Sequence, residues 1–378
     1  MTLYIFNPEH DYALANNEPH FVPPASAVKF AHDCAPFLRH IVSDDGFIYL
    51  PYADSESFLS LQGKRLATLP EPVTRIQPWG WDPLVMRQCK ELLEDNCPTG
   101  DDILPNIRKL AHRRNTIEAL HFLQQEMPDL TLPEPAQELF TIEEMEHYVE
   151  EHRDVIFKSP YSGNGRGHLY AHGECSPTLL RQGGGVIRRQ GSIMAEPLYE
   201  VIQDFAMEFC CRNGQAAFSG YSLFSTRHYG YAGNLLMSDE AIEETLSQWI
   251  PRTDLHRLQN TLTQHIENHI APQYDGFLGV DMFIYLQNRQ HRLNPMVEMN
   301  LRMTMGMAAH IIYERYVHPE SQGSMQLEFS PMSGALQDRT SQQPALRLKE
   351  GRWHSGFLSL TPIEKDTHYA ITVNINPL

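Results

Sequence analysis

The chain has 378 residues, 42% of them hydrophobic, and a slightly negative mean hydropathy, which indicates a globular protein of two or three domains. A formal net charge of −17 argues against a nucleic-acid surface, and the lack of an apolar run of about 18 residues argues against a membrane span. The first residues lack the basic segment of a signal peptide and the six cysteines include no C-x-x-C pair, so we expect a cytoplasmic protein with reduced thiols.

Alternating strand and helix patterns predict that residues 1–105 form a small open α/β domain. The polar turn Asn7 to Asp11 follows the first strand, where it either lines a substrate crevice at the carboxyl edge of the sheet or caps the strand. The elements that we expect here are a strand at Thr2 to Phe6, a helix from Ser26 to about His40, a strand at Phe47 to Tyr52 and a helix that starts at Asp82 and Pro83.

The next region, residues 106–190, brings a lysine to a glycine-rich loop. After a capping box at Thr141 to Glu144, the strand Val155 to Phe157 leads into Lys158. The loop that follows contains Gly163, Gly165, Arg166 and Gly167. Small residues let backbone N–H groups approach phosphate oxygens closely, and the lysine adds charge, although the spacing fits neither a Walker A loop nor the dinucleotide fingerprint. A glycine-rich stretch is also often only a turn, which is how we interpret Gly183 to Gly185.

Two neighbouring strands, Phe205 to Cys211 and Ala216 to Ser222, are predicted from their β-rich composition and the Arg-Asn-Gly turn between them. The segment Ser225 to Asn234 is predicted to be a polar loop. Its Arg227 either clamps a substrate carboxylate or lies on the surface against a tyrosine, and Asn234 is a second candidate for substrate binding.

A hairpin with an inward acid on each arm is the most informative part of the sequence. Asp281 interrupts the apolar strand Gly276 to Tyr285, and Glu298, Asn300 and Arg302 follow at alternate positions on the next strand, so their side chains share one side of the sheet. Two carboxylates and an amide oxygen suit a hard cation that bridges phosphates, and the arginine suits developing negative charge. A buried acid held only by backbone donors is the alternative.

Beyond the hairpin the signals are weaker. Residues 319–343, rich in Ser, Gln, Gly and Pro, are predicted to be a flexible excursion. A helix at Met303 to Val317 precedes it, and three strands follow it at about Ala345 to Leu348, His354 to Leu360 and Tyr369 to Ile375.

In this order, the lysine strand, glycine-rich loop and acid hairpin resemble the ATP-grasp superfamily over Arg113 to Gly306, about half of the chain. The resemblance implies an ATP-grasp fold of α/β (α+β) class, preceded by a pre-ATP-grasp domain at 1–105, with subdomains at 106–190 and 191–378. It implies that Lys158 and the loop glycines contact nucleotide phosphates and that Arg302 contacts phosphate or substrate. It further implies that Asp281, Glu298 and Asn300 ligate magnesium.

The same resemblance implies further nucleotide contacts. Glu196 and the backbone of Leu198 match the positions that read adenine, and Asp204 matches an acid that meets the ribose hydroxyls. Arg113 stands where the family carries another nucleotide-binding lysine, and its planar guanidinium is not equivalent to an ammonium.

The activity that the resemblance implies is an ATP-dependent carboxylate–amine ligase that works through an acyl phosphate. Its cofactors would be ATP and Mg²⁺, two ions with Mn²⁺ as a substitute, and its partners a small carboxylate and a small amine, with no nucleic acid and no membrane. A phosphotransferase on the same fold and a nucleotide-binding protein without turnover are the alternatives, and the oligomeric state stays open.

Overall fold

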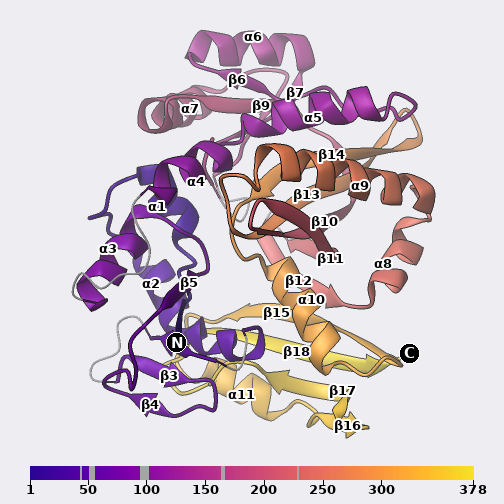
Figure 1. The fold of residues 1–378 in the computed structure, drawn as a ribbon. Helices are drawn as coiled ribbons and strands as arrows, with labels where there is room; N and C mark the ends of the chain where they lie inside the picture. Colours follow the sequence, from indigo (N-terminus) through magenta and orange to yellow (C-terminus); the bar gives the residue numbers. More distant parts are fainter. Residues whose placement is uncertain (43–44, 51–55, 94–101, 163–166, 228–229) are drawn as a thin grey trace.

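The computed structural model of the chain describes residues 1–42, 45–50, 56–93, 102–162, 167–227 and 230–378. Its strands form sheets of five, nine and four strands, with helices packed on them, so the predicted mixed α/β class is confirmed. In Figure 1 the four-stranded sheet lies at one end of the molecule, and the N-terminal sheet lies beside the C-terminal strands at the other. Within the described residues, no helix combines the length and the apolar character that a membrane crossing requires.

The N-terminal sheet has the order β4-β3-β2-β1-β5, and β1 runs parallel to both of its neighbours. The turn after β1 and the start of α3 therefore meet at one edge, where Asn7 Nδ2 donates to Asp82 Oδ2 at 2.9 Å. Asp82 also caps α3 by accepting from the Val85 N–H, as the Asp-Pro signal predicted. The elements of this region are β1 (Thr2–Ile5), α1 (His10–Asn16), α2 (Ala25–Cys34), the 3-10 helix η1 (Ala35–His40), β2 (Phe47–Tyr49), β3 (Phe58–Ser60), β4 (Arg65–Leu66), β5 (Arg75–Pro78) and α3 (Pro83–Leu93).

The four-stranded sheet is antiparallel in the order β6-β9-β7-β8. The predicted capping box is present, because Thr141 accepts from the Glu144 N–H and the Glu144 carboxylate accepts from the Thr141 N–H. This region and the segment before it contain α4 (Ile103–Ala111), α5 (Asn115–Glu126), β6 (Gln137–Leu139), α6 (Ile142–His152), β7 (Asp154–Lys158), β8 (Leu169–His172), α7 (Pro177–Gln190) and β9 (Ile193–Pro197).

The prediction of a turn at Gly183 to Gly185 is wrong, because these glycines lie inside α7. The helix passes so close to α6 that a Cβ atom on Gly183 would be 2.4 Å from Cε of Met145. Glycine is therefore required here for packing between helices and not for a reversal of the chain.

The nine-stranded sheet has the order β14-β13-β10-β11-β12-β15-β18-β17-β16. Successive side chains of β10 point to opposite faces of this sheet. Phe205 and Met207 are buried in the core beneath α9, whereas Ala206 and Glu208 lie on the face toward the four-stranded sheet. The elements of this region are β10 (Glu200–Arg212), β11 (Gln215–Arg227), β12 (Gly230–Leu236), α8 (Asp239–Leu246), α9 (Arg252–His269), β13 (Gly276–Gln287), β14 (Gln290–Asn300), α10 (Met305–Tyr316), β15 (Ser321–Phe329), α11 (Ala335–Ser341), β16 (Arg347–Lys349), β17 (Arg352–Ser359) and β18 (Tyr369–Pro377).

Two segments that we predicted to be irregular contribute strands to this sheet. In the part of 225–234 that the structure describes, β11 ends and β12 begins, and Phe224 pairs with Asn234. In 319–343, β15 pairs with β12 on one side and β18 on the other. Hydrogen bonds to two neighbouring strands outweigh the weak β propensity of a Ser- and Gln-rich sequence, so composition alone misled both predictions.

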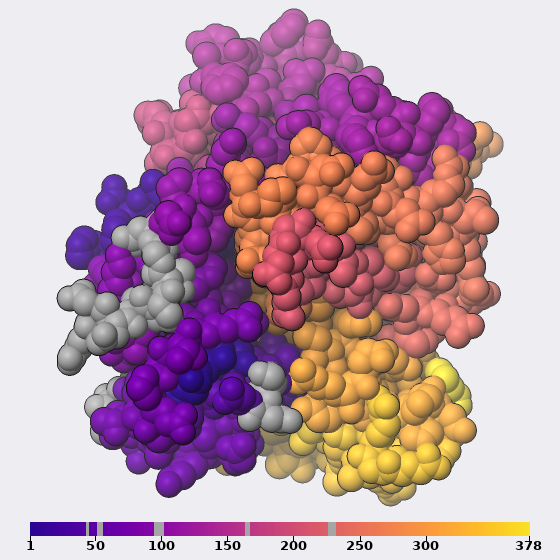
Figure 2. Space-filling model, viewed as in Figure 1, coloured from indigo at the N-terminus to yellow at the C-terminus, as the bar shows by residue number. Residues whose placement is uncertain are grey.

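One hydrophobic core joins the two ends of the chain. Tyr4 and Phe37 pack in the same cluster as Ile312 of α10 and Ile371 of β18. Figure 2 shows the N-terminal surface in indigo and purple beside the orange and yellow C-terminal part. The N-terminal region is therefore held against the large sheet, which brings the turn after β1 close to the end of β14.

Candidate active site

A cavity of about 530 Å³ lies between the four-stranded sheet and the start of the nine-stranded sheet. Alternation along the strands sends one set of side chains into it and the other set into the two cores. From the four-stranded sheet and the segment that follows it come Ile156, Lys158, His168, Tyr170, Glu196, Pro197, Leu198 and Tyr199. From the nine-stranded sheet and the segment after β14 come Asp204, Glu208, Ser222, Asn234, Asp281, Glu298, Asn300, Arg302 and Thr304, among others.

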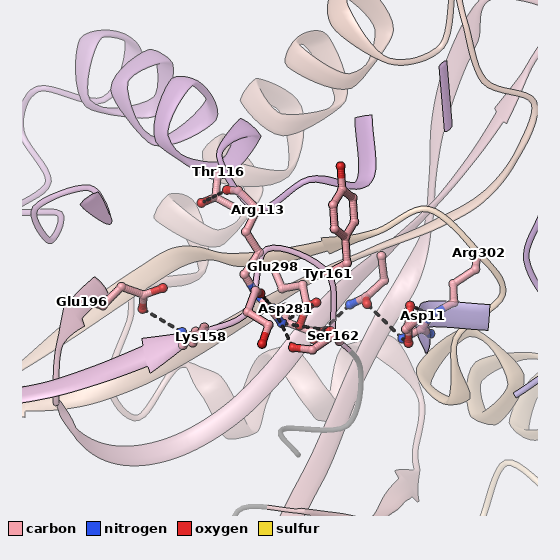
Figure 3. Close-up of polar contacts among 12 residues, drawn as sticks. Asp11, Arg113, Thr116, Lys158, Tyr161, Ser162, Glu196, Asp281, Glu298 and Arg302 are labelled. Carbon is pink, nitrogen blue, oxygen red and sulfur yellow. Dashed lines mark hydrogen bonds and ion pairs between the residues drawn. The ribbon is translucent and has the colours of Figure 1, made fainter. Parts of the chain in front are cut away.

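Lys158 and Glu196 form a buried ion pair at one end of the site. The Nζ atom of Lys158 is 2.7 Å from Oε2 of Glu196, and the two side chains are only 6% and 10% exposed. The two residues lie on β7 and β9, and Figure 3 shows them apart from the Asp11 and Arg302 pair. The glutamate holds the ammonium group at the end of its strand, in reach of a ligand that enters from the cavity.

Asp281 and Glu298 are directly opposite each other on β13 and β14, as the alternation predicted. Burial, and then the charge of Glu298, raise the pKa of Asp281 to about 7. Asn300 lines the same cavity and donates from Nδ2 to Oδ2 of Asp281 at 3.0 Å. An acid whose ionisation is opposed by burial and by a neighbouring carboxylate is a natural place for a cation.

Arg113 reaches this acid pair from the segment before α5. Its NH2 atom is 2.6 Å from Oε1 of Glu298, and its guanidinium also donates to the carbonyl oxygen of Ser159 and to Oγ of Ser162. Arg113 therefore links α5, the start of the glycine-rich loop and the acid hairpin, while its own Nε atom is buried without a partner among the described residues.

Arg302 lies just beyond β14 and points to the N-terminal turn. It donates to both oxygens of Asp11, and its NH2 atom also donates to Oδ1 of Asn300 at 3.0 Å. In Figure 3 Asp281 and Glu298 lie between this pair and Lys158. Asp11, which we predicted to lie in a polar loop, is instead in the first turn of α1, where it contacts a residue lining the cavity.

The remaining predicted residues divide into three groups. Leu198 and Asp204 line the cavity, and the N–H of Leu198 already donates to the carbonyl oxygen of Asp154 at 2.8 Å, so this N–H is not free to contact a ligand. Asn234 is buried in the cavity wall and donates to Oγ of Ser222 at 2.6 Å. Arg227 ends β11, where its backbone pairs with Gly230.

The glycine-rich loop is only partly described. Gly167 is exposed and has φ of 87°, a conformation that suits glycine. Gly163, Gly165 and Arg166 lie outside the residues that the structure describes, as does the side chain of Arg227.

Sequence reasoning missed two cavity residues. Glu208 is a single acid within the apolar run FAMEFCC, a visible signal that matched no motif. His168 follows the loop, and its Nε2 atom is buried with no hydrogen-bond partner among the residues that the structure describes. Burial and the nearby charge of Lys158 lower the pKa of His168 to about 3, which leaves a neutral imidazole beside the cavity.

The oxygen atoms present fit a magnesium ion. Among the described residues no three His, Cys, Asp or Glu side chains gather closely enough to hold a metal by themselves. Asp281, Glu298 and Asn300 instead offer two carboxylates and one amide oxygen, and magnesium sites in phosphate-handling proteins commonly pair one or two carboxylates with phosphate oxygens and water.

No protein-family model and no curated protein matches this sequence. Solved structures do match its fold. Biotin carboxylase from Campylobacter jejuni, in a complex with β-γ-ATP, is 14% identical with a TM-score of 0.50, and the match covers 80% of this chain and 71% of that one. N5-carboxyaminoimidazole synthetase from Staphylococcus aureus is 12% identical with a TM-score of 0.48, over 100% and 93% of the two chains. D-alanyl-alanine synthetase A from Vibrio cholerae is 12% identical with a TM-score of 0.46, over 81% and 89%.

Identities this low carry information about the fold alone. The biotin carboxylase match extends over most of the chain, well beyond the segment between Arg113 and Gly306 whose motifs suggested the superfamily. The chain therefore has the ATP-grasp fold that its lysine strand and acid hairpin predicted.

Proposed function

We propose that the protein is an ATP- and magnesium-dependent ligase that joins a small carboxylate to an amine through an acyl phosphate. The observation that carries the proposal is the arrangement of one cavity within an ATP-grasp fold. Lys158 enters it from one sheet, and Asp281, Glu298 and Asn300 enter it from the other. Opposite charges on facing walls suit a polyphosphate with its metal ions.

The nucleotide would lie along the four-stranded sheet. Glu196 and the carbonyl oxygen of Leu198 supply acceptors for an adenine amino group, and Asp204 supplies one for the ribose hydroxyls. Unpartnered buried polar atoms support a polar ligand here, since Nε2 of His168 and Nε of Arg113 each cost about 1–3 kcal/mol if they stay without a partner.

Asp281, Glu298 and Asn300 would hold one or two magnesium ions, which would reduce the negative charge of the phosphates. Lys158 and Arg113 place further positive charge on that side of the cavity, and Arg302 stands at the far edge of the acid pair. Their work is to position the phosphates and to stabilise the charge that builds up during phosphoryl transfer, because little acid–base chemistry is required.

The reaction balances without any further reagent. A carboxylate oxygen attacks the γ-phosphorus, forming an O–P bond while the bond from the γ-phosphorus to the bridging oxygen breaks and ADP leaves. A neutral amine then attacks the acyl carbon, forming a C–N bond as the C–O bond breaks, and inorganic phosphate leaves with the proton that the nitrogen gives up. Walls that exclude water protect the acyl phosphate from hydrolysis.

The test is an ADP-release screen with ATP, Mg²⁺ and pools of amino acids and small carboxylates. We expect ADP and inorganic phosphate only when an acid and an amine are both present. A phosphorylated product that accumulates without amine would make the protein a phosphotransferase, and nucleotide binding without ADP release in any pool would make it a binding protein.

A further inference from the structure

Glu208 is a buried acid in the cavity wall that the phosphate and metal contacts do not use. It lies on β10 with 1% of its surface exposed, and none of the ion pairs among the described residues includes it. It pairs across the sheet with Gly279 of β13, which in turn pairs with Asn300 of β14. Only Gly279 therefore stands between Glu208 and the candidate metal ligand Asn300 across the sheet, and Glu208 lines the same cavity.

Two glycines pack directly against the two oxygen atoms of Glu208. A Cβ atom at Gly306 would be 2.1 Å from Oε1, and one at Gly279 would be 2.8 Å from Oε2. Any larger residue at either position would collide with the carboxylate. The floor of the cavity is therefore packed closely around this side chain.

The two oxygen atoms of Glu208 have different surroundings: Oε2 accepts a hydrogen bond from Thr304, and Oε1 lies at the cavity floor. Thr304 Oγ1 accepts from the Met307 N–H at 2.8 Å, so its own proton is free to point to Oε2 of Glu208, also at 2.8 Å. On the other side, Oε1 lies near Gly306 and the hydroxyl of Ser222. Ser222 Oγ already accepts from Asn234, which leaves its O–H as a donor.

No basic side chain among the described residues forms an ion pair with the carboxyl group of Glu208. Burial, opposed by the Thr304 hydrogen bond, raises the pKa of Glu208 to about 8, with Asp281 of β13 adding to the rise and Arg302 reducing it. On the α10 side His310 lies over Gly220, the β11 partner of Glu208, but it is 3.5 Å from Asp239. A ligand that brings a small positive charge would thus be stabilised here.

We propose that Glu208 binds the ammonium group of the amine substrate and takes up its proton before the amine attacks. The ammonium assignment follows from the geometry, and the catalytic part rests on the ligase function proposed above. The compact floor selects a primary amine over a secondary or tertiary one.

The proton transfer balances. The N–H bond of the ammonium breaks, its proton passes to a carboxylate oxygen of Glu208, and the nitrogen retains the electron pair. That pair forms the new C–N bond with the acyl carbon while the C–O bond to phosphate breaks. The nitrogen then gives up a second proton to the departing phosphate, which leaves a neutral amide. Glu208 later returns its proton to solvent or to the departing phosphate.

The first experiment measures binding alone. Methylammonium chloride is titrated into the full chain in the presence of Mg²⁺ and a non-hydrolysable ATP analogue, and the methyl signal is followed by NMR. We expect Glu208→Gln to raise the dissociation constant at least tenfold. The matched control is Glu200→Gln, which removes an exposed charge from the same strand and should change it less than twofold.

Each other outcome of the titration overturns the ammonium site. Absence of saturable binding to the wild-type chain would do so, as would equal effects of the two substitutions. If potassium ions displaced methylammonium at a concentration below that of methylammonium itself, Glu208 would belong to a metal-cation site instead. Because Gln keeps the size of the side chain and resembles a protonated Glu, the variant is expected to fold, and circular dichroism checks this.

The second experiment separates the role of Glu208 from the ligase function. Hydroxylamine is largely neutral at pH 7 and traps acyl phosphates as hydroxamates without a base. Glu208→Gln should keep hydroxamate formation within threefold of wild type while ligation of a primary amine falls at least a hundredfold. Equal losses in both assays would contradict the proposal, whereas a wild-type chain that forms no hydroxamate with any carboxylate would contradict the ligase function and leave the titration to decide on Glu208.

Discussion

Asp11 accepts two hydrogen bonds from Arg302, with Oδ1 3.2 Å from Nε and Oδ2 3.1 Å from NH2, although 291 residues separate them in the chain. The contact ties the start of α1 to the segment just after β14. Because Arg302 also donates to Asn300, the position of the arginine beside the candidate metal ligands depends on the N-terminal region. The first sheet thus contributes to the site through one ion pair.

Asp11→Asn should destabilise the protein by about 2–4 kcal/mol, because it leaves the guanidinium of Arg302 largely buried without its charge partner. Urea unfolding of the two proteins measures the difference. The control is Asp129→Asn, which breaks an exposed pair with Arg257 and should cost less than about 1 kcal/mol. Equal losses in the two variants would show that the Asp11 pair adds no more than a surface contact.

The effect of Asp11→Asn should depend on pH. Burial raises the pKa of Asp11, but Arg302 and His10 outweigh it and bring the pKa below its ordinary value of 3.8. The stabilisation is therefore fully present above pH 4 and is lost as the pH falls through the lower folded-state pKa. Urea midpoints of both proteins at pH 6 and pH 3 measure this, and a difference that grows in acid would contradict it.

Glu9 should show the opposite pH dependence. Its pKa is raised from 4.5 to about 7, first by burial and further by Asp82, and its Oε2 atom has no hydrogen-bond partner. The folded chain then holds a proton that the unfolded chain has released, so the wild type loses stability relative to Glu9→Gln as the pH rises from 4.5 to 7. The relative gain of the variant should reach about 3 kcal/mol above pH 7, by unfolding in urea at pH 4.5 and 8. A constant difference across this range would be inconsistent with a buried protonated acid.

Loss of either acid of the hairpin should stop turnover without unfolding the chain. Glu298→Gln and Asp281→Asn keep side-chain size but remove a carboxylate ligand, so we expect ADP release to fall at least a hundredfold, on the order of 3 kcal/mol of transition-state stabilisation. The exposed Glu267→Gln on α9 is the control and should retain full activity. A normal magnesium-dependent rate in both acid variants would refute the metal assignment.

The contribution of Lys158 to nucleotide binding can be separated from its contribution to stability through the ion pair with Glu196. Lys158→Met should raise the dissociation constant of an ATP analogue at least tenfold, equivalent to about 1.4 kcal/mol, and should also destabilise the fold by leaving Glu196 buried and unpaired. Adding Glu196→Gln should restore much of the stability but not the affinity. Recovery of nucleotide affinity in the double variant would show that Lys158 acts only through packing.

Local sequence patterns correctly predicted the features that depend on residues close together in the chain, such as strand alternation and helix caps. Alternation placed Asp281, Glu298 and Asn300 on one face, and the Thr141 capping box and the Asp82-Pro83 start were found as expected. The contact between Asp11 and Arg302 was not predictable, since nothing in either segment encodes a partner so far away in the sequence. Tertiary packing also overrode local signals at Gly183, where a helix approaches another, and in β15, which two neighbouring strands stabilise.

Transfer of oxygen from the carboxylate to phosphate tests the proposed ligase chemistry most directly. With an acid found in the ADP-release screen and labelled with ¹⁸O in its carboxyl group, each turnover through an acyl phosphate should move one ¹⁸O atom into inorganic phosphate, detected by mass spectrometry or ³¹P NMR. We predict that ¹⁸O appears in inorganic phosphate only when both ATP and the amine are present. Unlabelled phosphate alongside formed amide, or phosphate that stays bound to the acid as a stable product, would contradict the account.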